Sequence, residues 1–214
     1  MKNLFVTTKL TNDNHTYDLV MSSFEQSLKD LGLDYVDLFL IHWPRPMKYR
    51  DNWEKANEET WRAMEELYDA GRIRALGVSN FQKHHIYALL KTARIRPAVN
   101  QIRLCPGCTQ DELVSYSRSL GMVLEAYSPL GTGKIFGVEE VLNMASRYGR
   151  SVAQLCIRWS LQMGFLPLPK SVNKDRIIQN LDVFDFELSP EDMNALTGLT
   201  GCAGLAPDAD NMPW

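Results

Sequence analysis

Short apolar runs alternate along the chain with longer segments in which apolar residues recur every three or four positions. The short runs are rich in Val, Ile, Leu and Phe and are bounded by polar residues, a pattern typical of strands. They predict strands at residues 4–8, 36–41, 73–79, 98–102, 122–126 and 165–170.

The longer segments predict amphipathic helices, because apolar residues at steps of three and four share one helical face. The four clearest faces comprise Tyr17, Met21, Phe24, Leu28 and Leu31; Trp61, Met64, Leu67 and Tyr68; Leu113, Tyr116, Ser117 and Leu120; and Val152, Leu155, Trp159 and Met163. Ser151 precedes the last of these segments and is a predicted N-cap.

Strands that alternate with helices predict crossover connections and a parallel sheet, either open and doubly wound or closed into a barrel. The polar residues at the strand ends favour the barrel, because the C-terminal ends of barrel strands converge on one mouth. The groups at these ends are Lys9, His42, Ser79 with Asn80, Gln101, Tyr127, and Lys170 with Ser171. We therefore expect an α/β fold of the (β/α)8 type.

Composition narrows the class of protein. The 214 residues are 45% hydrophobic and 23% charged, as expected for one globular domain over residues 1–214. A net charge of −3 gives no basic surface for nucleic acid, and no apolar run approaches the ~20 residues of a membrane span. The four cysteines do not suggest a disulfide scaffold, so we expect a cytoplasmic protein.

Six motifs in order resemble those of the aldo-keto reductase family. They are LFVTTKL, LGLDYVDLFLIHWP, GRIRALGVSNF, VNQI, LEAYSPLG and LPKSVNKDRIIQN, and together they cover nearly the whole chain. The tail, AGLAPDADNMPW, is similar to the C-terminal loop of bacterial members such as the diketogluconate reductases.

The resemblance implies catalytic roles for Lys9 and His42. In the family, this lysine lowers the pKa of a catalytic tyrosine, since a nearby ammonium favours the phenolate. His42 would orient and polarise the substrate carbonyl, and Trp43 would form a wall of the substrate pocket. Each residue also has a purely structural interpretation: a solvated strand-end lysine, a structural histidine, and a core tryptophan.

The resemblance also implies a nicotinamide site. Three polar residues would hold the carboxamide, which needs both donors and acceptors; these are Ser79, Asn80 and Gln101. Tyr127 would stack on the nicotinamide ring and determine which face transfers hydride. Ser128 and Leu130 would belong to the loop that covers the pyrophosphate.

The stretch from residue 170 to residue 180 combines basic residues with the start of a helix, which is typical of a phosphate site. The family uses this arrangement for the 2′-phosphate and adenine of NADP, so we expect NADP(H) rather than NAD. The residues concerned are Lys170, Ser171, Val172, Arg176, Gln179 and Asn180. Gln179 replaces an acidic residue common at its position in the family.

Only six strands are predicted, whereas a (β/α)8 barrel has eight in about 250 residues. By resemblance, the first two barrel strands are absent, and with them the family's catalytic Asp and Tyr. Three alternatives follow for the unpaired edges: a barrel closed with fewer strands, two chains paired across the gap, or truncation of a longer reading frame.

The expected function is NADPH-dependent reduction of a small aldehyde or ketone to an alcohol, impaired by the missing proton donor. The alternative is an NADP-binding barrel remnant, non-catalytic or completed by oligomerisation. A third class, a dithiol redox protein, would use Cys105 and Cys108 of the CPGC sequence, but we interpret this pair as incidental. GTGK at residues 131–134 lacks the rest of a phosphate-loop motif, and His15, His84 and His85 are expected at the surface.

Overall fold

A computed structural model describes residues 4–213. Within these residues the chain forms two compact units. The first comprises residues 4–101, 116–122 and 207–213, and the second comprises residues 102–115 and 123–206. The C-terminal segment therefore returns to the unit in which the chain begins.

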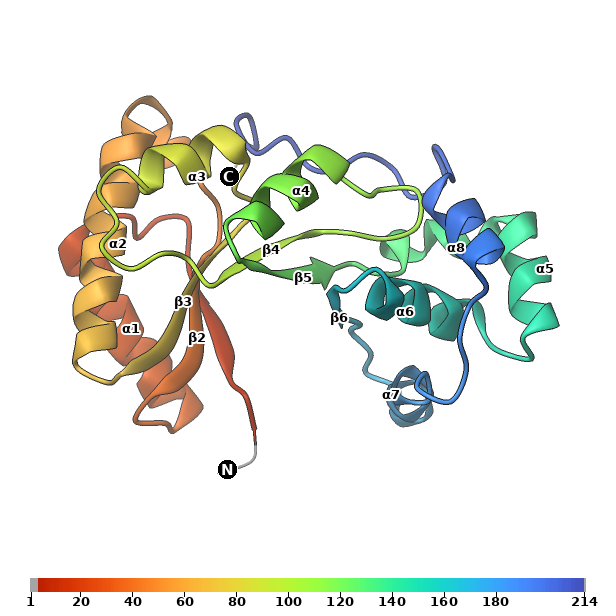
Figure 1. The fold of residues 1–214 in the computed structure, drawn as a ribbon. Coiled ribbons are helices and arrows are strands. Elements are labelled where there is room, and N and C mark those ends of the chain that lie inside the picture. The colour runs from red at the N-terminus through yellow and green to blue at the C-terminus, as the bar shows by residue number, and fades with distance from the viewer. Residues whose placement is uncertain (1–3, 214) are drawn as a thin grey trace. The chain divides into compact units, whose positions relative to one another are not determined.

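The first unit is built on parallel strands, each paired with the next along the chain (Figure 1). The strands are β1 (Thr7–Leu10), β2 (Val36–Ile41), β3 (Ile73–Ser79) and β4 (Val99–Arg103), whose last two residues belong to the second unit. Every residue of β2 is buried, as expected for a parallel strand covered on both faces.

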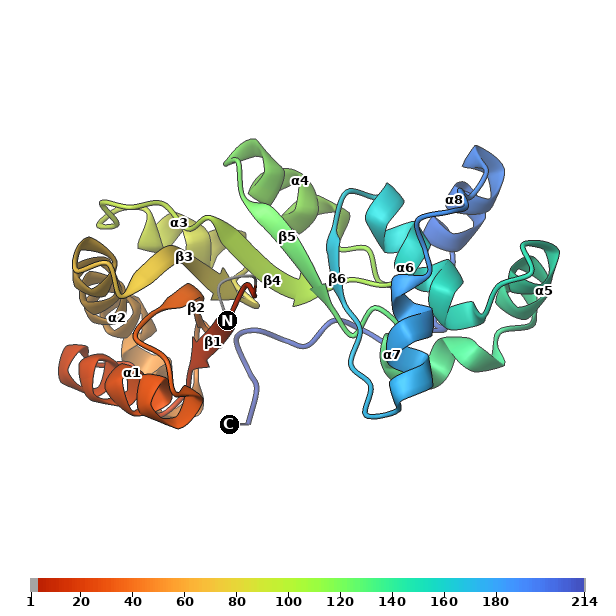
Figure 2. The same cartoon turned by 90° about the horizontal axis from the view of Figure 1, so that it is seen from below.

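Helices α1 and α2 lie against the same side of this sheet in both views (Figures 1 and 2). The helical segments of the unit are α1 (Tyr17–Leu31), the short 3₁₀ helix η1 (Met47–Asn52), α2 (Trp53–Asp69) and α3 (Lys83–Leu89). Phe24 of α1 packs edge-on against Phe39 of β2, with ring centroids 5.1 Å apart. Gly32 ends α1 with a φ of 65°, a left-handed conformation that glycine adopts at little cost.

The second unit holds two parallel strands and most of the remaining helices. These are β5 (Val123–Tyr127), η2 (Gly131–Gly137), α5 (Glu139–Arg147), α6 (Val152–Gln162), β6 (Leu166–Leu168), α7 (Lys174–Leu181) and α8 (Pro190–Thr197). Helix α4 (Asp111–Ser119) begins in this unit and ends in the first. Helix α6 contacts β6, α5 and α7.

The sequence predicts strands 36–41 and 73–79 to the residue, and the predicted apolar helix face from Tyr17 to Leu31 lies on α1. The predicted N-cap is also confirmed, because Ser151 Oγ accepts a hydrogen bond from the Gln154 backbone N–H. The predicted ends of strands 98–102 and 122–126 are one residue too early. Tyr127 is thus the last residue of β5 and does not follow it.

Two edge strands differ more. The first strand was expected at residues 4–8 but spans Thr7–Leu10, so Lys9 lies inside it. Val6 precedes the strand, and its N–H donates to a side chain, Asp37 Oδ2, at 2.9 Å. The last strand was expected at residues 165–170 but covers only Leu166–Leu168, with one proline inside it and a second, Pro169, directly after it.

The expectation for the histidines is wrong at two of three positions. His84 is exposed, but His15 and His85 are completely buried. His15 stacks on Tyr49, and His85 meets the edge of Trp53 at 4.8 Å. No helix within residues 4–213 is long and apolar enough to cross a membrane.

Candidate active site

Lys9 and His42 stand on neighbouring strands of the first unit. Lys9 is partly buried in β1, and His42 directly follows β2. Partial desolvation and the positive charge of Lys9 both lower the pKa of His42. The imidazole is therefore mostly neutral near pH 7, and a neutral imidazole offers a carbonyl oxygen an N–H donor.

Trp43 is buried, and its ring meets that of His42 edge to face at 6.5 Å. Its indole N–H donates to the Ala209 carbonyl at 2.9 Å. The C-terminal segment is tied to this region a second time, because the Arg50 guanidinium donates to the Met212 carbonyl. The segment after residue 206 therefore fixes the side chain that follows His42.

His15 is an additional histidine beside His42. Burial lowers the pKa of His15 to about 4, although the Asn57 side chain opposes this shift, and the charge of His42 adds a smaller lowering. Among the described residues, neither ring nitrogen of His15 has a partner in hydrogen-bond geometry. The site thus contains a buried neutral imidazole that the sequence pattern did not indicate.

Ser79 at the end of β3, Asn80 directly after it and Gln101 in the middle of β4 form a connected, buried group. Ser79 Oγ donates to the Gln101 carbonyl at 2.9 Å, and the Asn80 backbone N–H donates to the same carbonyl at 3.0 Å. The Asn80 amide donates to the His42 carbonyl at 3.2 Å and to Ser79 Oγ at 3.1 Å. Asn80 has a φ of 62°, a left-handed conformation that asparagine tolerates better than most residues.

In the second unit, Tyr127 ends β5 and is followed by a turn that contains Ser128 and Leu130. Burial raises the pKa of Tyr127 to about 12, although the nearby Arg103 guanidinium opposes the shift. The phenol therefore stays protonated at all physiological pH values. This makes Tyr127 a poor acid or base and is consistent with a stacking role.

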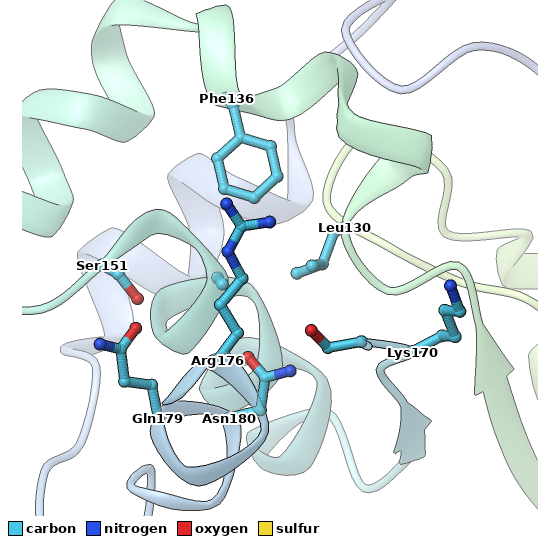
Figure 3. A pocket seen from close by; sticks show the side chains of 9 residues that line it. Leu130, Phe136, Ser151, Lys170, Arg176, Gln179 and Asn180 are labelled. Carbon is cyan, nitrogen blue, oxygen red and sulfur yellow. The ribbon is translucent and has the colours of Figure 1, made fainter. Parts of the chain in front are cut away.

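A cavity of about 420 Å³ opens in the second unit. Figure 3 shows Arg176 extending from α7 toward the ring of Phe136, with Gln179 and Asn180 of the same helix beside it. The lining residues are Leu130, Phe136, Ser151, Ala153, Lys170, Ser171, Arg176, Gln179 and Asn180. Six of them are residues that the sequence predicts for the cofactor.

The cavity is positively charged on one side. Among residues 4–213, no ion pair joins Lys170 or Arg176 to a carboxylate. The N-cap residue Asn173 accepts from the Arg176 N–H at 3.0 Å and so fixes the start of α7 beside Ser171. An anion placed here would meet two uncompensated cations and a helix N-terminus.

Four residues differ from what the sequence predicts for this cavity. Val172 does not line it, and this residue is 87% exposed. Phe136, Ser151 and Ala153 do line it but were not predicted for the site. The only signal for Ser151 was its role as a helix cap, and Phe136 lies in a 3₁₀ segment without any hydrophobic periodicity.

Residues 1–200 match the aldo/keto reductase family. The chain belongs to this family. Over 209 residues it is 46% identical to the glyoxal reductase of Bacillus subtilis, a match that covers 98% of this chain and 73% of the relative.

Solved aldo-keto reductases share the fold. One from a Medee basin deep-sea metagenome library superimposes with a TM-score of 0.92 at 36% identity, covering 100% of this chain and 77% of that one. A Bombyx mori aldo-keto reductase in complex with NADP gives a TM-score of 0.81 at 40% identity. The match covers 92% of this chain and 67% of that one. The chain is therefore an α/β protein with part of the TIM-type barrel of aldo-keto reductases.

Proposed function

We propose that this aldo-keto reductase binds NADP(H) and uses it to reduce small aldehydes or ketones. The observation that carries the proposal is the cavity of the second unit, where Lys170 and Arg176 form no ion pair with any carboxylate of residues 4–213. A 2′-phosphate distinguishes NADP from NAD and is the group that such a basic site selects. The NADP complex of the Bombyx mori relative supports the same cofactor.

In this proposal, each predicted residue has one task. Lys170, Ser171 and Arg176 bind the 2′-phosphate, the backbone at Val172 follows it, and Gln179 and Asn180 contact adenine. Ser128 and Leu130 cover the pyrophosphate. As the family resemblance implies, Tyr127 would stack on the nicotinamide ring, and Ser79, Asn80 and Gln101 would hold the nicotinamide carboxamide.

The bound dinucleotide would supply hydride to the carbonyl carbon. His42, neutral near pH 7, would donate a hydrogen bond to the carbonyl oxygen and polarise it. Lys9 would hold positive charge beside the developing alkoxide, and Trp43 would exclude water. Without the family's tyrosine we expect a rate reduced by ~10²–10⁴, the usual contribution of general acid catalysis.

The first test is a titration with NADPH and with NADH, followed by tryptophan fluorescence. Arg176→Ala should weaken NADPH binding by roughly 10–100-fold, because a hydrogen bond to a charged group contributes about 1.5–3 kcal/mol. Binding of NADH should change little, since NADH lacks the phosphate. Arg147→Ala is a matched control, because Arg147 pairs with Asp192 away from the cavity. Equal affinities for the two nucleotides would contradict the proposal.

The second test is steady-state oxidation of NADPH with small carbonyl compounds. Glyoxal is the first substrate to try, because the Bacillus subtilis relative is a glyoxal reductase. Slow turnover that His42→Ala reduces further would support an impaired reductase. Nucleotide binding without any turnover would instead favour the alternative, a non-catalytic NADP-binding protein or a barrel completed by a second chain, for which a solution molecular weight provides the check.

We also propose that residues 1–214 fold as one cooperative domain. Urea unfolding followed by fluorescence and by circular dichroism should then give a single coincident transition. Two separate transitions would mean that the two compact units unfold independently.

A further inference from the structure

The sequence Cys105-Pro106-Gly107-Cys108 folds into a tight turn closed by two backbone hydrogen bonds. The Cys105 N–H donates to the Cys108 carbonyl at 3.2 Å, and the Cys108 N–H donates to the Cys105 carbonyl at 2.9 Å. Pro106 and Gly107 occupy the central positions, and the Gly107 φ of 80° suits a turn of type II. The cysteines therefore form an isolated antiparallel bridge.

This backbone arrangement matches the requirements of a disulfide. Residues that exchange both hydrogen bonds in an antiparallel pair have Cα atoms about 5.5 Å apart, within the usual disulfide range of 4.4–6.8 Å. The two thiols are also within hydrogen-bond reach of each other. A bond between the sulfurs would need little movement of the backbone.

The thiols differ in acidity because of their surroundings. The hydrogen bond from the Cys105 thiol, together with the Arg103 guanidinium, lowers the pKa of Cys108 to about 7 although burial opposes this. The hydrogen bond to Cys108, together with burial, raises the pKa of Cys105. Cys108 is thus the better nucleophile, because the thiolate is the reactive form of cysteine.

Solvent exposure also favours Cys108 as the reacting thiol. Cys105 is completely buried, whereas Cys108 keeps 8% of its surface. Cys202 packs beside the turn, and its thiol faces the Pro106 carbonyl at 3.9 Å. A third thiol therefore lies near the pair without belonging to the turn.

We propose that Cys105 and Cys108 are a redox-active pair that forms an intramolecular disulfide when a peroxide reaches the turn. The Cys108 thiolate attacks one peroxide oxygen, and the O–O bond breaks. Hydroxide is the leaving group, and Cys108 becomes a sulfenic acid. The Cys105 sulfur then attacks Cys108, the S–O bond breaks, and the Cys105 proton leaves with the hydroxyl as water. The pair is oxidised by two electrons and the peroxide is reduced.

The turn changes the interpretation made from sequence, in which the pair was incidental. A C-x-x-C sequence alone leaves the distance and the acidity of the thiols open. The backbone bridge sets the distance, and Arg103 provides a cation beside the thiolate. Tyr127 of the same unit is close enough for Cys108 to raise its pKa, so oxidation would occur beside a predicted cofactor residue.

The test treats the reduced 214-residue chain with hydrogen peroxide and then maps the cysteines by mass spectrometry after alkylation. We expect loss of the mass of two hydrogen atoms, a Cys105–Cys108 link, and full reversal by dithiothreitol. Cys202→Ser and Cys156→Ser should still form the link, and they serve as matched controls. A link to Cys202 or Cys156, or two thiols that remain open to alkylation after peroxide, would overturn the proposal.

Two further variants separate the steps. Cys105→Ser should leave a sulfenic acid on Cys108 that dimedone traps, whereas Cys108→Ser should leave no trapped sulfenic acid at Cys105. Far-UV circular dichroism checks that each variant is folded, and Cys105→Ala replaces Cys105→Ser if the hydroxyl is not tolerated. Trapping at Cys105 in place of Cys108 would refute the assigned order of reaction.

Discussion

The buried His15 should make the stability of the fold fall at acid pH. Its folded pKa is about 4, whereas an unfolded histidine has a value near 6.5. Below pH 6.5 the unfolded chain therefore binds a proton that the folded chain does not, and protonation favours unfolding. The contribution of neutral His15 to the free energy of unfolding is fully present above pH 6.5 and is lost as the pH falls toward 4.

The size of the effect follows from the two pKa values. Between about pH 7.5 and about pH 5 the difference amounts to about 2 kcal/mol, rising to about 3.4 kcal/mol below pH 4. His15→Phe and His15→Gln remove the titration, so each variant should lose about 2 kcal/mol less than the parent over this interval. His85, whose pKa burial also lowers to about 4, remains in the variants and contributes equally to all three proteins.

The assay is urea unfolding at both pH values, followed by tryptophan fluorescence and with reversibility checked. The comparison uses the change in free energy with pH and not the free energy itself, because each substitution also alters packing against Tyr49. Two replacements of different size guard against a packing effect that itself varies with pH. Equal pH dependence in the parent and both variants would refute the assigned burial and protonation state of His15.

Three further predictions concern packing, capping and thiol acidity. Gly77→Ala should destabilise the fold by about 1–3 kcal/mol in urea unfolding. The added Cβ would lie 2.5 Å from Leu40 Cδ2 and 3.0 Å from the Val99 carbonyl oxygen. An unchanged urea midpoint would contradict this packing. Ser151→Ala should cost about 0.5–2 kcal/mol in the same assay, whereas Ser151→Thr, which keeps the capping oxygen, should cost less. Alkylation of Cys108 by iodoacetamide should rise with pH about a midpoint near 7, because the Cys105 thiol and Arg103 lower the pKa of Cys108. A midpoint above about 8.5 would contradict this assignment.

The sequence predicts best where one local pattern determines the structure. Helix α1 has a regular apolar face, and the predicted face residues from Tyr17 to Leu31 all lie on it. Strand β6 was predicted too long because the apolar run was weighed above the prolines within it. The same local reasoning identified the basic residues of α7, since a charged helix N-terminus is visible in the sequence.

The features that could not be predicted from the sequence depend on contacts that form only when the chain folds. The burial of His85 requires Trp53 and Asp210, which lie far from it in the chain. Phe136 of η2 lines the cavity together with residues of α7, which lies far from it in the chain, and no local periodicity predicts that proximity. The acidity of Cys108 arises from the closure of its turn, so C-x-x-C spacing alone could not determine it.

Strand β6 is the last strand in the order of the sheet, and its prolines affect whether strands of other chains can pair with it. Leu166 is 51% exposed and Leu168 is 42% exposed, so the strand presents an apolar surface to solvent. Prolines in sheets are confined to places where the missing N–H would face solvent, and Pro167 and Pro169, two residues apart, remove donors from the same side. An incoming strand would find acceptors there without the matching donors, so the two prolines disfavour strand pairing with another chain along this edge.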